Sequence, residues 1–492
     1  MARLAQHSPR LESEFWPTWA VVFRKVDIGM PKTHARASKP DSEEEVSGLP
    51  VLRPKVAGID LGSETHWVCA PSVDGSRREV EKFGATTPEL GRMVEWLKAR
   101  QVESVAMEST GVYWIAPHEI LERHEFEVVL VNTRELARVP GRKKTDRVDC
   151  KWIQRLHGCG LLTGSFRPKE QVCMLRTLVR DQGNLVAEAG DWLRRMQKSL
   201  DQMNVRVHRA VSDLDGVTGM GIVRAIVKGE RDARQLAKLR DRRCQKSEEE
   251  IAEQLSGHWR EDHLFSLQQA LKMYDAVQER IAEYERETLR KLGEMEREEC
   301  REQEAPKLNN PQKAKAIGKR GEEPMRQALY RISGVDLTGI DAIGVETVKV
   351  VISEYGPDLS HFPTEKQFVS HVTLAPHKAM SGGKPVKKKK RGSASTRVAG
   401  ALRMAALSLR HSDTALGAYY RQIARRIGAD VAVFASARKL ATLIYRLLRW
   451  GQPYVDEGAA AYETRYQQGR LKRLAGMAKD LGYQLTPKAS QT

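Results

Sequence analysis

The sequence is poor in cysteine, and the few cysteines it has form no regular pattern. The six, Cys69, Cys150, Cys159, Cys173, Cys244 and Cys300, are scattered over 492 residues without a C-x-x-C pair. Disulfide scaffolds and cysteine-based zinc sites need closely spaced or regularly repeated cysteines, so this usage argues against both. It is typical of a protein in a reducing cytosol.

Long apolar runs are also missing. No stretch approaches the roughly 18 uncharged apolar residues that a membrane-spanning helix requires. The apolar patch from Phe15 to Phe23 is short, contains Pro17 and lacks a small-residue cleavage site, so we do not interpret it as a signal peptide. We therefore expect no membrane partner.

Negative charge is in short supply. Lys and Arg number 82 against 64 Asp and Glu, which gives a net charge of +18. Such an excess favours a polyanionic partner, with nucleic acid before membrane. Hydrophobic residues still make up 40% of the chain, enough for a sizeable core. At roughly 150 residues per domain, the length indicates about three domains.

The composition changes along the chain and divides it into five expected segments. They are a disordered N-terminal extension (1–54), an α/β domain (55–215), a helical coiled-coil-like connector with a polar linker (216–329), a mostly α-helical domain (330–455) and a charged helical tail (456–492). Proline, serine and charged residues dominate the first segment, so it can bury little surface.

The start of the second segment alternates strand and helix patterns. Strands are expected at 55–60, 65–72, 79–86, 102–109 and 126–132, and helices at 87–100 and 113–124. For the first helix, Thr87 is the expected cap and Pro88 lies in its first turn. Three strands in a meander followed by helix–strand–helix–strand predict a mixed sheet with helices on its faces.

Helical patterns dominate the rest. Long helices are expected within 170–214, a glycine-rich break at 213–221, a second helical stretch at 246–299 and a polar linker at 304–324. An apolar seam of coiled-coil spacing runs through Leu264, Leu267, Leu271, Tyr274, Val277, Ile281 and Tyr284. The seam fits an antiparallel hairpin packed on itself and dimerisation equally well.

Four carboxylates occupy positions that favour a metal site. Asp60 ends the first strand and Glu108 the fourth, and in such a sheet these two strands lie side by side. Asp146 and Asp149 are three residues apart at the start of a helix, hence on one face. Four converging carboxylates would repel one another without cations, and hard oxygen ligands suit Mg²⁺ or Mn²⁺. Two such ions about 3.5–4 Å apart promote in-line displacement at a phosphodiester.

Each acid also has a structural interpretation. An aspartate at a strand end is usually a turn residue, and Asp146 alone could be an acid favoured by the helix dipole. The order of the four and their strand context favour the metal site over these alternatives.

At this point the sequence resembles the DEDD transposases of the insertion-sequence 110 family. The resemblance is carried first by GIDLGSETHWV (58–68), AMESTGVYW (106–114), VLVN (129–132) and GRKKTDRVDCKWI (141–153). It resumes at 332–356, 362–376, 381–384 and 401–423. Together the two parts cover roughly 55–215 and 330–455, and the family's acidic tetrad falls on Asp60, Glu108, Asp146 and Asp149.

The resemblance implies more than the composition does. It implies an RNase H-like, RuvC-like catalytic domain and a carboxy-terminal transposase domain. Members are recombinases of insertion sequences, guided by a structured bridge RNA that pairs with donor and target DNA. A serine acts with the carboxylate site of a partner subunit and forms a phosphoserine link to DNA. We accordingly expect DNA, a bridge RNA and a homo-oligomer, dimer or tetramer, as partners, in the cytoplasm and associated with the nucleoid.

By the same resemblance the nucleophile falls on Ser381. Gly382 and Gly383 would permit close approach of a phosphate, and six cations follow within eight residues. A serine hydroxyl needs a base or a metal to activate it, and the tetrad's ions could serve. The sequence alone fits an incidental serine in a flexible basic loop; the resemblance favours the nucleophile.

Nucleic-acid contacts are expected from two basic stretches and a hairpin. The named candidates are Arg142, Lys143, Lys144, Arg147, Lys384, Lys387, Lys388, Lys389, Lys390 and Arg391, with Arg134 and Arg138 upstream. A solvated face is the alternative. Gly339 and Gly344 fit either a helix-hairpin-helix-like turn that binds phosphate or tight turns between core helices. Tyr419, Tyr420 and Trp450 could stack on bases, although aromatics at helical spacing are more often core.

Three rival functions are weaker. A sugar-kinase or actin-like ATPase has a similar first loop but needs a second phosphate loop, which we do not find. A RuvC-like structure-specific nuclease that hydrolyses with water is the nearest alternative in chemistry. A coiled-coil nucleic-acid-binding protein with a decayed site would not retain four intact acids.

Overall fold

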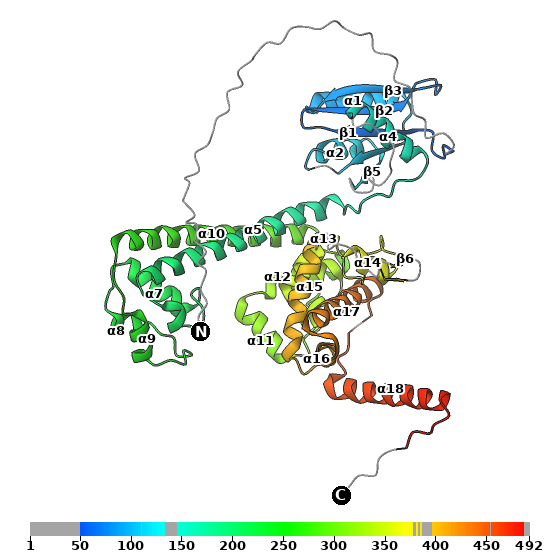
Figure 1. Cartoon of the computed structure of the whole chain (residues 1–492). Helices are drawn as coiled ribbons and strands as arrows, with labels where there is room; N and C mark the ends of the chain where they lie inside the picture. Colours follow the sequence, from blue (N-terminus) through cyan, green and yellow to red (C-terminus); the bar gives the residue numbers. More distant parts are fainter. Residues whose placement is uncertain are drawn as a thin grey trace, which may run out of the picture. The chain divides into compact units, whose positions relative to one another are not determined.

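The computed structural model describes residues 50–109, 111–132, 145–376, 380–381, 384–385, 396–452 and 454–486, and of 380–381 and 384–385 it describes the backbone. The expected extension lies outside this part except for residues 50–54. These five belong to the folded protein, because the backbone N–H groups of Leu52 and Arg53 donate to the Gly158 carbonyl at 2.8 and 2.9 Å. The described chain forms two compact units, which divide between Ser165 and Phe166 (Figure 1).

The first unit contains the predicted mixed sheet. Its strands are β1 (Val56–Leu61), β2 (Thr65–Pro71), β3 (Arg78–Gly84), β4 (Ser104–Glu108) and β5 (Glu127–Val131). They lie in the order β3-β2-β1-β4-β5, with β1, β2 and β3 antiparallel and β1, β4 and β5 parallel. The meander, the crossovers and the adjacency of β1 and β4 are confirmed. This order is that of an RNase H-like sheet, so the expected fold class is confirmed as well.

Helices cover both faces of this sheet, and alternation along the strands decides which side chains each face receives. α1 (Thr87–Ala99) and α2 (Ile115–Arg123) lie over one face. The core beneath them includes Ile59, Val68 and Met107. The other face receives α4 (Asp146–Gly158), which packs with Ala106 and Val131. Successive strand residues thus alternate between two separate apolar clusters.

The cap of α1 differs from the prediction by one residue. The helix begins at Thr87, so the N-cap position falls on Thr86, whose side chain makes no capping hydrogen bond. Glu89, in the first turn, instead accepts from the backbone N–H of Gly84 at the end of β3. The predicted cap at Thr87 was therefore wrong, although Pro88 does lie in the first turn.

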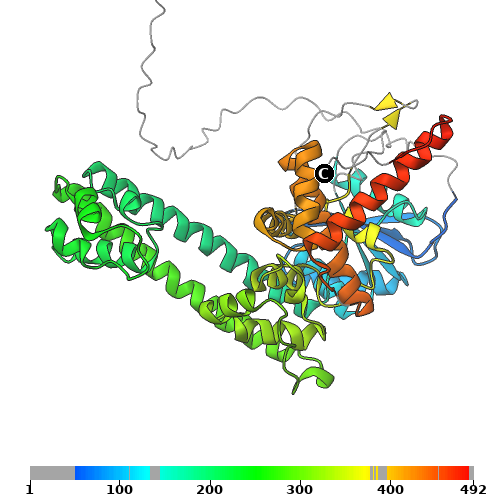
Figure 2. The same cartoon turned by 90° about the horizontal axis from the view of Figure 1, so that it is seen from below.

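The second unit begins with a long helical hairpin. α5 (Glu170–Gln202) and α10 (Glu261–Glu294) lie side by side and run in opposite directions (Figure 1, Figure 2). The turn end holds α6 (Val207–Ala210), α7 (Val217–Val227), α8 (Ala233–Ala237) and α9 (Glu248–Leu255). Seam residues Leu267, Leu271, Tyr274 and Val277 are buried in the cluster that joins these helices. Within one chain the seam thus forms the antiparallel hairpin, one of the two expected alternatives.

Two expected irregular segments are partly helical. The glycine-rich break at 213–221 already contains the start of α7, which begins at Val217. The polar linker contains α11 (Pro311–Arg320), capped by the Asn310 side chain and ended by Gly321 at φ 69°. Both predictions were wrong there. In α11, capping residues and one buried side chain, Ile317, are enough to fix a helix in a polar stretch. α7 begins within the glycine-rich stretch and buries Thr218 and Gly219 in its first turn.

The remaining helices surround the largest apolar cluster. They are α12 (Glu323–Ser333), α13 (Val345–Tyr355), α14 (Glu365–His371), α15 (Arg397–Ser408), α16 (Ala415–Ile427) and α17 (Ala429–Trp450), with 3-10 turns at Glu298–Cys300, Leu337–Gly339 and Leu409–His411. α18 (Gly458–Asp480) packs on α16 and buries none of its own residues. Of the helices in the described part of the chain, none combines the length and apolarity that a membrane crossing requires.

Candidate active site

Asp60 and Glu108 lie at neighbouring strand ends on one face of the sheet. The parallel register pairs Ile59 with Met107, so the next position brings Asp60 beside Glu108. Adjacent strands are about 4.8 Å apart, which places two half-buried carboxylates next to each other. Their face is the one that α4 covers, because it alternates with the α1 face that buries Ile59 and Met107.

α4 runs antiparallel to β1, which determines the edge that its first turn approaches. At its C-terminal end the Gly158 carbonyl accepts from Leu52 and Arg53, just before β1 begins. In its middle the Gln154 side chain donates to the Val56 carbonyl at 3.3 Å. The first turn of α4 therefore lies toward the carboxyl end of β1, where Asp60 is.

A glycine allows the helix to come this close. A Cβ on Gly58 would lie 2.2 Å from the Gln154 nitrogen and 2.5 Å from the Cys150 carbonyl oxygen, so no side chain fits. Both obstacles are backbone atoms of α4 and cannot move aside. Gly58 was not singled out from the sequence, although its place two residues before Asp60 on the same strand face is the available signal.

The first turn of α4 extends from this contact toward Asp60. Thr145 caps the helix by accepting from the Val148 N–H at 3.4 Å. From Cys150 back to Asp146 the helix covers about 6 Å. From Gly58 to Asp60 the strand covers about 6.6 Å, so the two acid pairs reach the same level. Asp149 is half-buried and Asp146 exposed.

The four acids are thus delivered to one edge by three elements, but they are not in metal-binding contact here. Among the described residues, no group of three or more His, Cys, Asp and Glu side chains is close enough to hold a metal ion. The stretch 133–144, directly before α4, lies outside the described residues. The tetrad as a set of ligands therefore stays a prediction.

Cys150 is buried on α4, directly after Asp149. Burial raises the pKa of its thiol well above the ordinary value, and the nearby Cys69 and the Asp60 carboxylate raise it further. The thiol therefore stays protonated at neutral pH, and it donates to the Arg147 carbonyl at 3.3 Å.

Ser381 belongs to the other compact unit. It lies in β6 (Met380–Ser381), which pairs antiparallel with β7 (Lys384–Pro385) so that Ser381 faces Lys384. The segment that contains this pair is tied at its ends, since the Thr396 hydroxyl donates to the Val372 carbonyl at 3.1 Å. Ser381 is thus on a short strand pair, where the sequence alone had indicated a flexible loop.

Most of the expected basic contacts lie outside the described residues. These are Arg134, Arg138, Arg142, Lys143, Lys144, Lys387, Lys388, Lys389, Lys390 and Arg391. Arg147 is described, and it is exposed in the first turn of α4 beside Asp146 and Asp149. Lys384 is described as the backbone partner of Ser381 in β7.

The expected hairpin between α12 and α13 is fixed by buried side chains and by Lys313. Ile340 and Ile343 are buried, and the Lys313 ammonium on α11 donates to the carbonyls of Thr338 and Ile340. Burial lowers the pKa of Lys313 to about 8. No described atom lies within 4 Å of a Cβ built on Gly339 or Gly344, so packing does not explain either glycine. The phosphate-binding turn and the tight-turn interpretation both remain predictions.

The three aromatic candidates differ in exposure. Tyr420 is buried in the helical core, whereas the Trp450 side chain is 57% exposed at the end of α17. Tyr419 is half-buried and meets the Tyr462 ring edge to face at 6.4 Å. Only Trp450 therefore presents a largely open ring.

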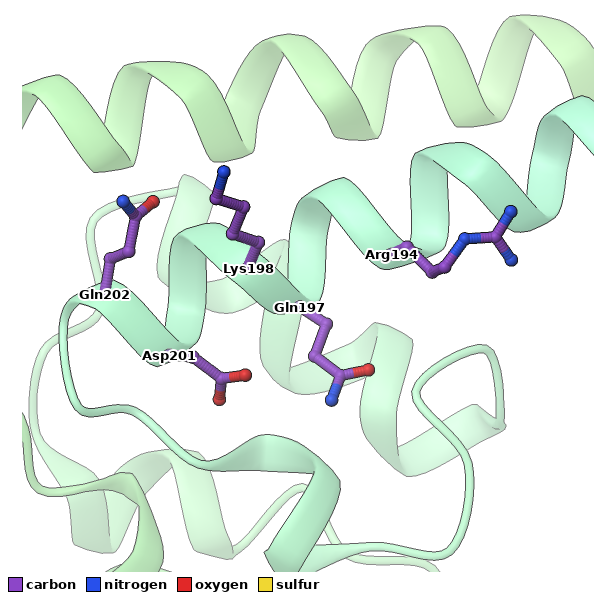
Figure 3. Close-up of a pocket in the computed structure, with 5 residues that line it drawn as sticks. All are labelled: Arg194, Gln197, Lys198, Asp201 and Gln202. Atoms are coloured by element: carbon purple, nitrogen blue, oxygen red, sulfur yellow. The ribbon is translucent and has the colours of Figure 1, made fainter. Parts of the chain in front are cut away.

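Two surface hollows lie in the second unit. The first, of about 500 Å³, is lined by Arg194, Gln197, Lys198, Asp201 and Gln202, all on α5 (Figure 3). There Gln197 and Asp201 point to the same side of the helix, and Asp201 pairs with His208 at 3.2 Å. The second, of about 510 Å³, lies between α16, α17 and α18. Neither contains one of the four acids or Ser381.

Comparison with protein families finds two matches, in the order that the sequence predicted. Residues 57–205 match the model of the DEDD transposase of IS110, described as a transposase. Residues 334–421 match the model described as the transposase IS116/IS110/IS902 family. The first match crosses the division between the two units and includes α5. No curated protein matches the chain.

Proposed function

The chain belongs to the IS110 family of transposases, and from this premise we propose that it cuts and rejoins DNA through a metal-bound carboxylate tetrad and a serine nucleophile. The enzyme is a DNA transposase of the DEDD type. The finer steps, the metal ligands, the serine and a guide RNA, are our proposal.

One observation carries the proposal. Asp60 and Glu108 stand side by side on the sheet face that receives α4, and α4 points its first turn, with Asp146 and Asp149, toward them. Three elements far apart in sequence thus bring acids to one edge. A structural role explains each acid singly but gives no reason for the coincidence.

The donor set fits hard divalent cations. All four groups are carboxylates, which suit Mg²⁺ or Mn²⁺. Asp60, Glu108, Asp146 and Asp149 would hold the ions, two in our proposal. When bound, such ions stabilise the attacking and leaving oxygens of an in-line displacement. The family usually implies divalent metal use.

Ser381 supplies the nucleophile in this proposal. Its hydroxyl oxygen forms a bond to the phosphorus of the scissile phosphodiester, while the bond from phosphorus to one sugar oxygen breaks. The hydroxyl proton goes to the departing sugar oxygen. In the rejoining step a sugar hydroxyl attacks the phosphoserine, restores a diester and returns the proton to Ser381. Both steps exchange one ester for another, so the bond energy is conserved.

Ser381 and the acids belong to different compact units, which supports a site assembled from more than one body. We propose that the serine segment of one subunit acts with the carboxylates of a partner subunit in a homo-oligomer. We further propose that a bridge RNA encoded by the element selects the DNA by base pairing, much as in other guided systems. The net charge of +18 supports polyanionic partners.

A covalent adduct tests the proposal. The protein, purified from cells that carry the flanking non-coding DNA, is incubated with labelled donor DNA and Mg²⁺ and run on a denaturing gel. We expect a labelled protein band that Ser381→Ala abolishes while DNA and RNA binding persist. Asp60→Asn should abolish both the adduct and cutting. Cutting without an adduct, unaffected by Ser381→Ala, would instead establish a hydrolytic nuclease.

A further inference from the structure

A row of side chains crosses the sheet at the level of the acids. The strand registers pair Trp67 with Asp60 and with Lys82, and Glu108 with Val131. Because paired residues point to the same face, Lys82, Trp67, Asp60 and Glu108 form one continuous row on the α4 side. At about 4.8 Å per strand, Trp67 is one step from Asp60 and Lys82 is two.

Trp67 is unusual among the large apolar residues of this sheet. It is half-buried, and within the described residues it belongs to neither of the two apolar clusters that flank the sheet. The Lys82 ammonium lies over its ring, 5.6 Å from the centroid, and the Lys82 side chain is exposed. Neither apolar cluster therefore accounts for the tryptophan.

We propose that Trp67 and Lys82 bind one nucleotide of the DNA strand being cut, on the β2 side of the scissile phosphate. The base stacks on the Trp67 ring, and Lys82 leaves the ring to pair with a backbone phosphate. This inference rests on the proposed function, since it places the strand along the acid row. Trp67 and Lys82 act here as positioning residues for the DNA.

Replacing the Lys82 ammonium on the Trp67 ring by a stacked base, with Lys82 paired to a phosphate, is favourable in free energy. An exposed cation–π contact such as that of Lys82 on Trp67 is among the weak interactions of proteins. A base stacked on an aromatic ring contributes more, and stacking accepts any base because each has a π face. A lysine on phosphate adds a salt-dependent term. The pair therefore suits a recombinase whose base reading is done elsewhere, because it holds a strand without selecting its sequence.

Two other surface features are weaker candidates for binding a nucleotide near the acids. Trp450 is exposed but lies in the second unit, and its described ring contact is with Tyr445. The hollow on α5 is lined by one helix face alone. The Trp67–Lys82 pair is favoured because the register ties it directly to Asp60.

An abasic scan tests the inference. The full-length Ser381→Ala protein is titrated, in EDTA, with fluorescent single-stranded oligonucleotides from the element's end, each with one abasic nucleotide. With intact DNA, Trp67→Ala should weaken binding about fivefold to 150-fold. For the protein that retains Trp67, removing the base at one position should weaken binding by the same factor. For Trp67→Ala, removing that base should weaken binding no further, as expected when the ring and the base are the two partners of one contact. Trp67→Phe should restore most of the affinity.

The role of Lys82 is tested separately, by the salt dependence of DNA binding. Lys82→Gln should reduce the slope of log affinity against log salt by about 0.7 for a single strand. Trp192→Ala is the matched control, because Trp192 on α5 also lies under a cation, with the Arg195 guanidinium 4.2 Å from its ring centroid. This variant should bind every oligonucleotide like the parent.

The outcomes separate this inference from the proposed function. Unchanged affinity of Trp67→Ala, or an equal loss on every abasic oligonucleotide with a lower melting temperature, would overturn the stacking role. Neither result touches the adduct assay, since the binding assay uses a protein without the serine and without metal. Conversely, a missing serine adduct would leave the abasic result standing.

Discussion

The two halves of the proposed active site are built in different ways. The carboxylates lie on strands and a helix that meet through backbone contacts, with Gly58 as the point of closest approach. Ser381 lies on a two-residue strand pair in a segment tied at its ends by Thr396 and Val372. The acid edge is therefore fixed by core contacts, whereas the described contacts of the serine segment are the strand pair and the Thr396–Val372 hydrogen bond.

The largest effect should come from filling the space at Gly58. Gly58→Val forces a side chain into backbone atoms 2.2 and 2.5 Å from its Cβ, so α4 must separate from β1. We expect a loss of at least about 4 kcal/mol in the free energy of unfolding, beyond ordinary overpacking. Urea unfolding followed by circular dichroism measures it.

Gly91→Ala is the control for Gly58. It lies within α1 of the same unit, and no described atom lies within 4 Å of a Cβ built there. This change should leave stability the same or raise it by up to about 1 kcal/mol. If Gly58→Val unfolds no more easily than Gly91→Ala, the acid edge is not fixed by the core and the comparison fails.

The sequence predicted this edge well for identifiable reasons. Each strand is a short apolar run bounded by turn residues, so β1 and β4 were located, and the rule for crossover strands made them neighbours. Gly58 and Trp67 were missed because their roles depend on register and on the approach of α4, which no local pattern encodes. α11 was missed because its 310–321 stretch is polar, although Asn310 and Gly321 are capping residues.

The second prediction concerns the buried cation that supports the second unit. The pKa of Lys313 falls from 10.5 to about 8 because burial penalises its charged form. The unfolded chain thus binds more protons between these values, so stability should rise with pH from about 8 to 10.5. At about 1.36 kcal/mol per pKa unit, the rise is at most about 3 kcal/mol.

Unfolding in urea at pH 7.5 and at pH 10 measures the effect. Lys313→Met removes the titrating group and should flatten the difference between the two pH values. If the free energy of unfolding depends on pH in the same way in the parent and in the variant, Lys313 is charged to the same extent in the folded and unfolded states. The hairpin between α12 and α13 would then depend on contacts other than a buried ammonium of lowered pKa.

The third prediction weakens the tie on the serine segment. Thr396 caps α15 by accepting from the Ala399 N–H at 3.1 Å, and its hydroxyl donates to the Val372 carbonyl. Thr396→Val removes both bonds and should cost about 1 kcal/mol of stability. Adduct formation should fall by more than this loss of folded protein explains. Thr414→Val, which removes the equivalent cap of α16, should lower stability without that additional loss.

The smallest effect should come from the ion pair that anchors α14 ahead of the serine segment. Glu365 accepts from Arg446 at 2.7 and 3.2 Å, and both side chains are about one third exposed. The hydrogen bond from Arg446 lowers the pKa of Glu365, so its stabilisation is present above pH 4.5 and is lost as the pH falls through the lowered value. Because solvent screens the pair, Glu365→Gln should cost less than about 1 kcal/mol at pH 7 and less still at pH 2. Thermal melts at both pH values measure this. A loss as large as that expected for Gly58→Val would mean that the serine side is held as firmly as the acid edge.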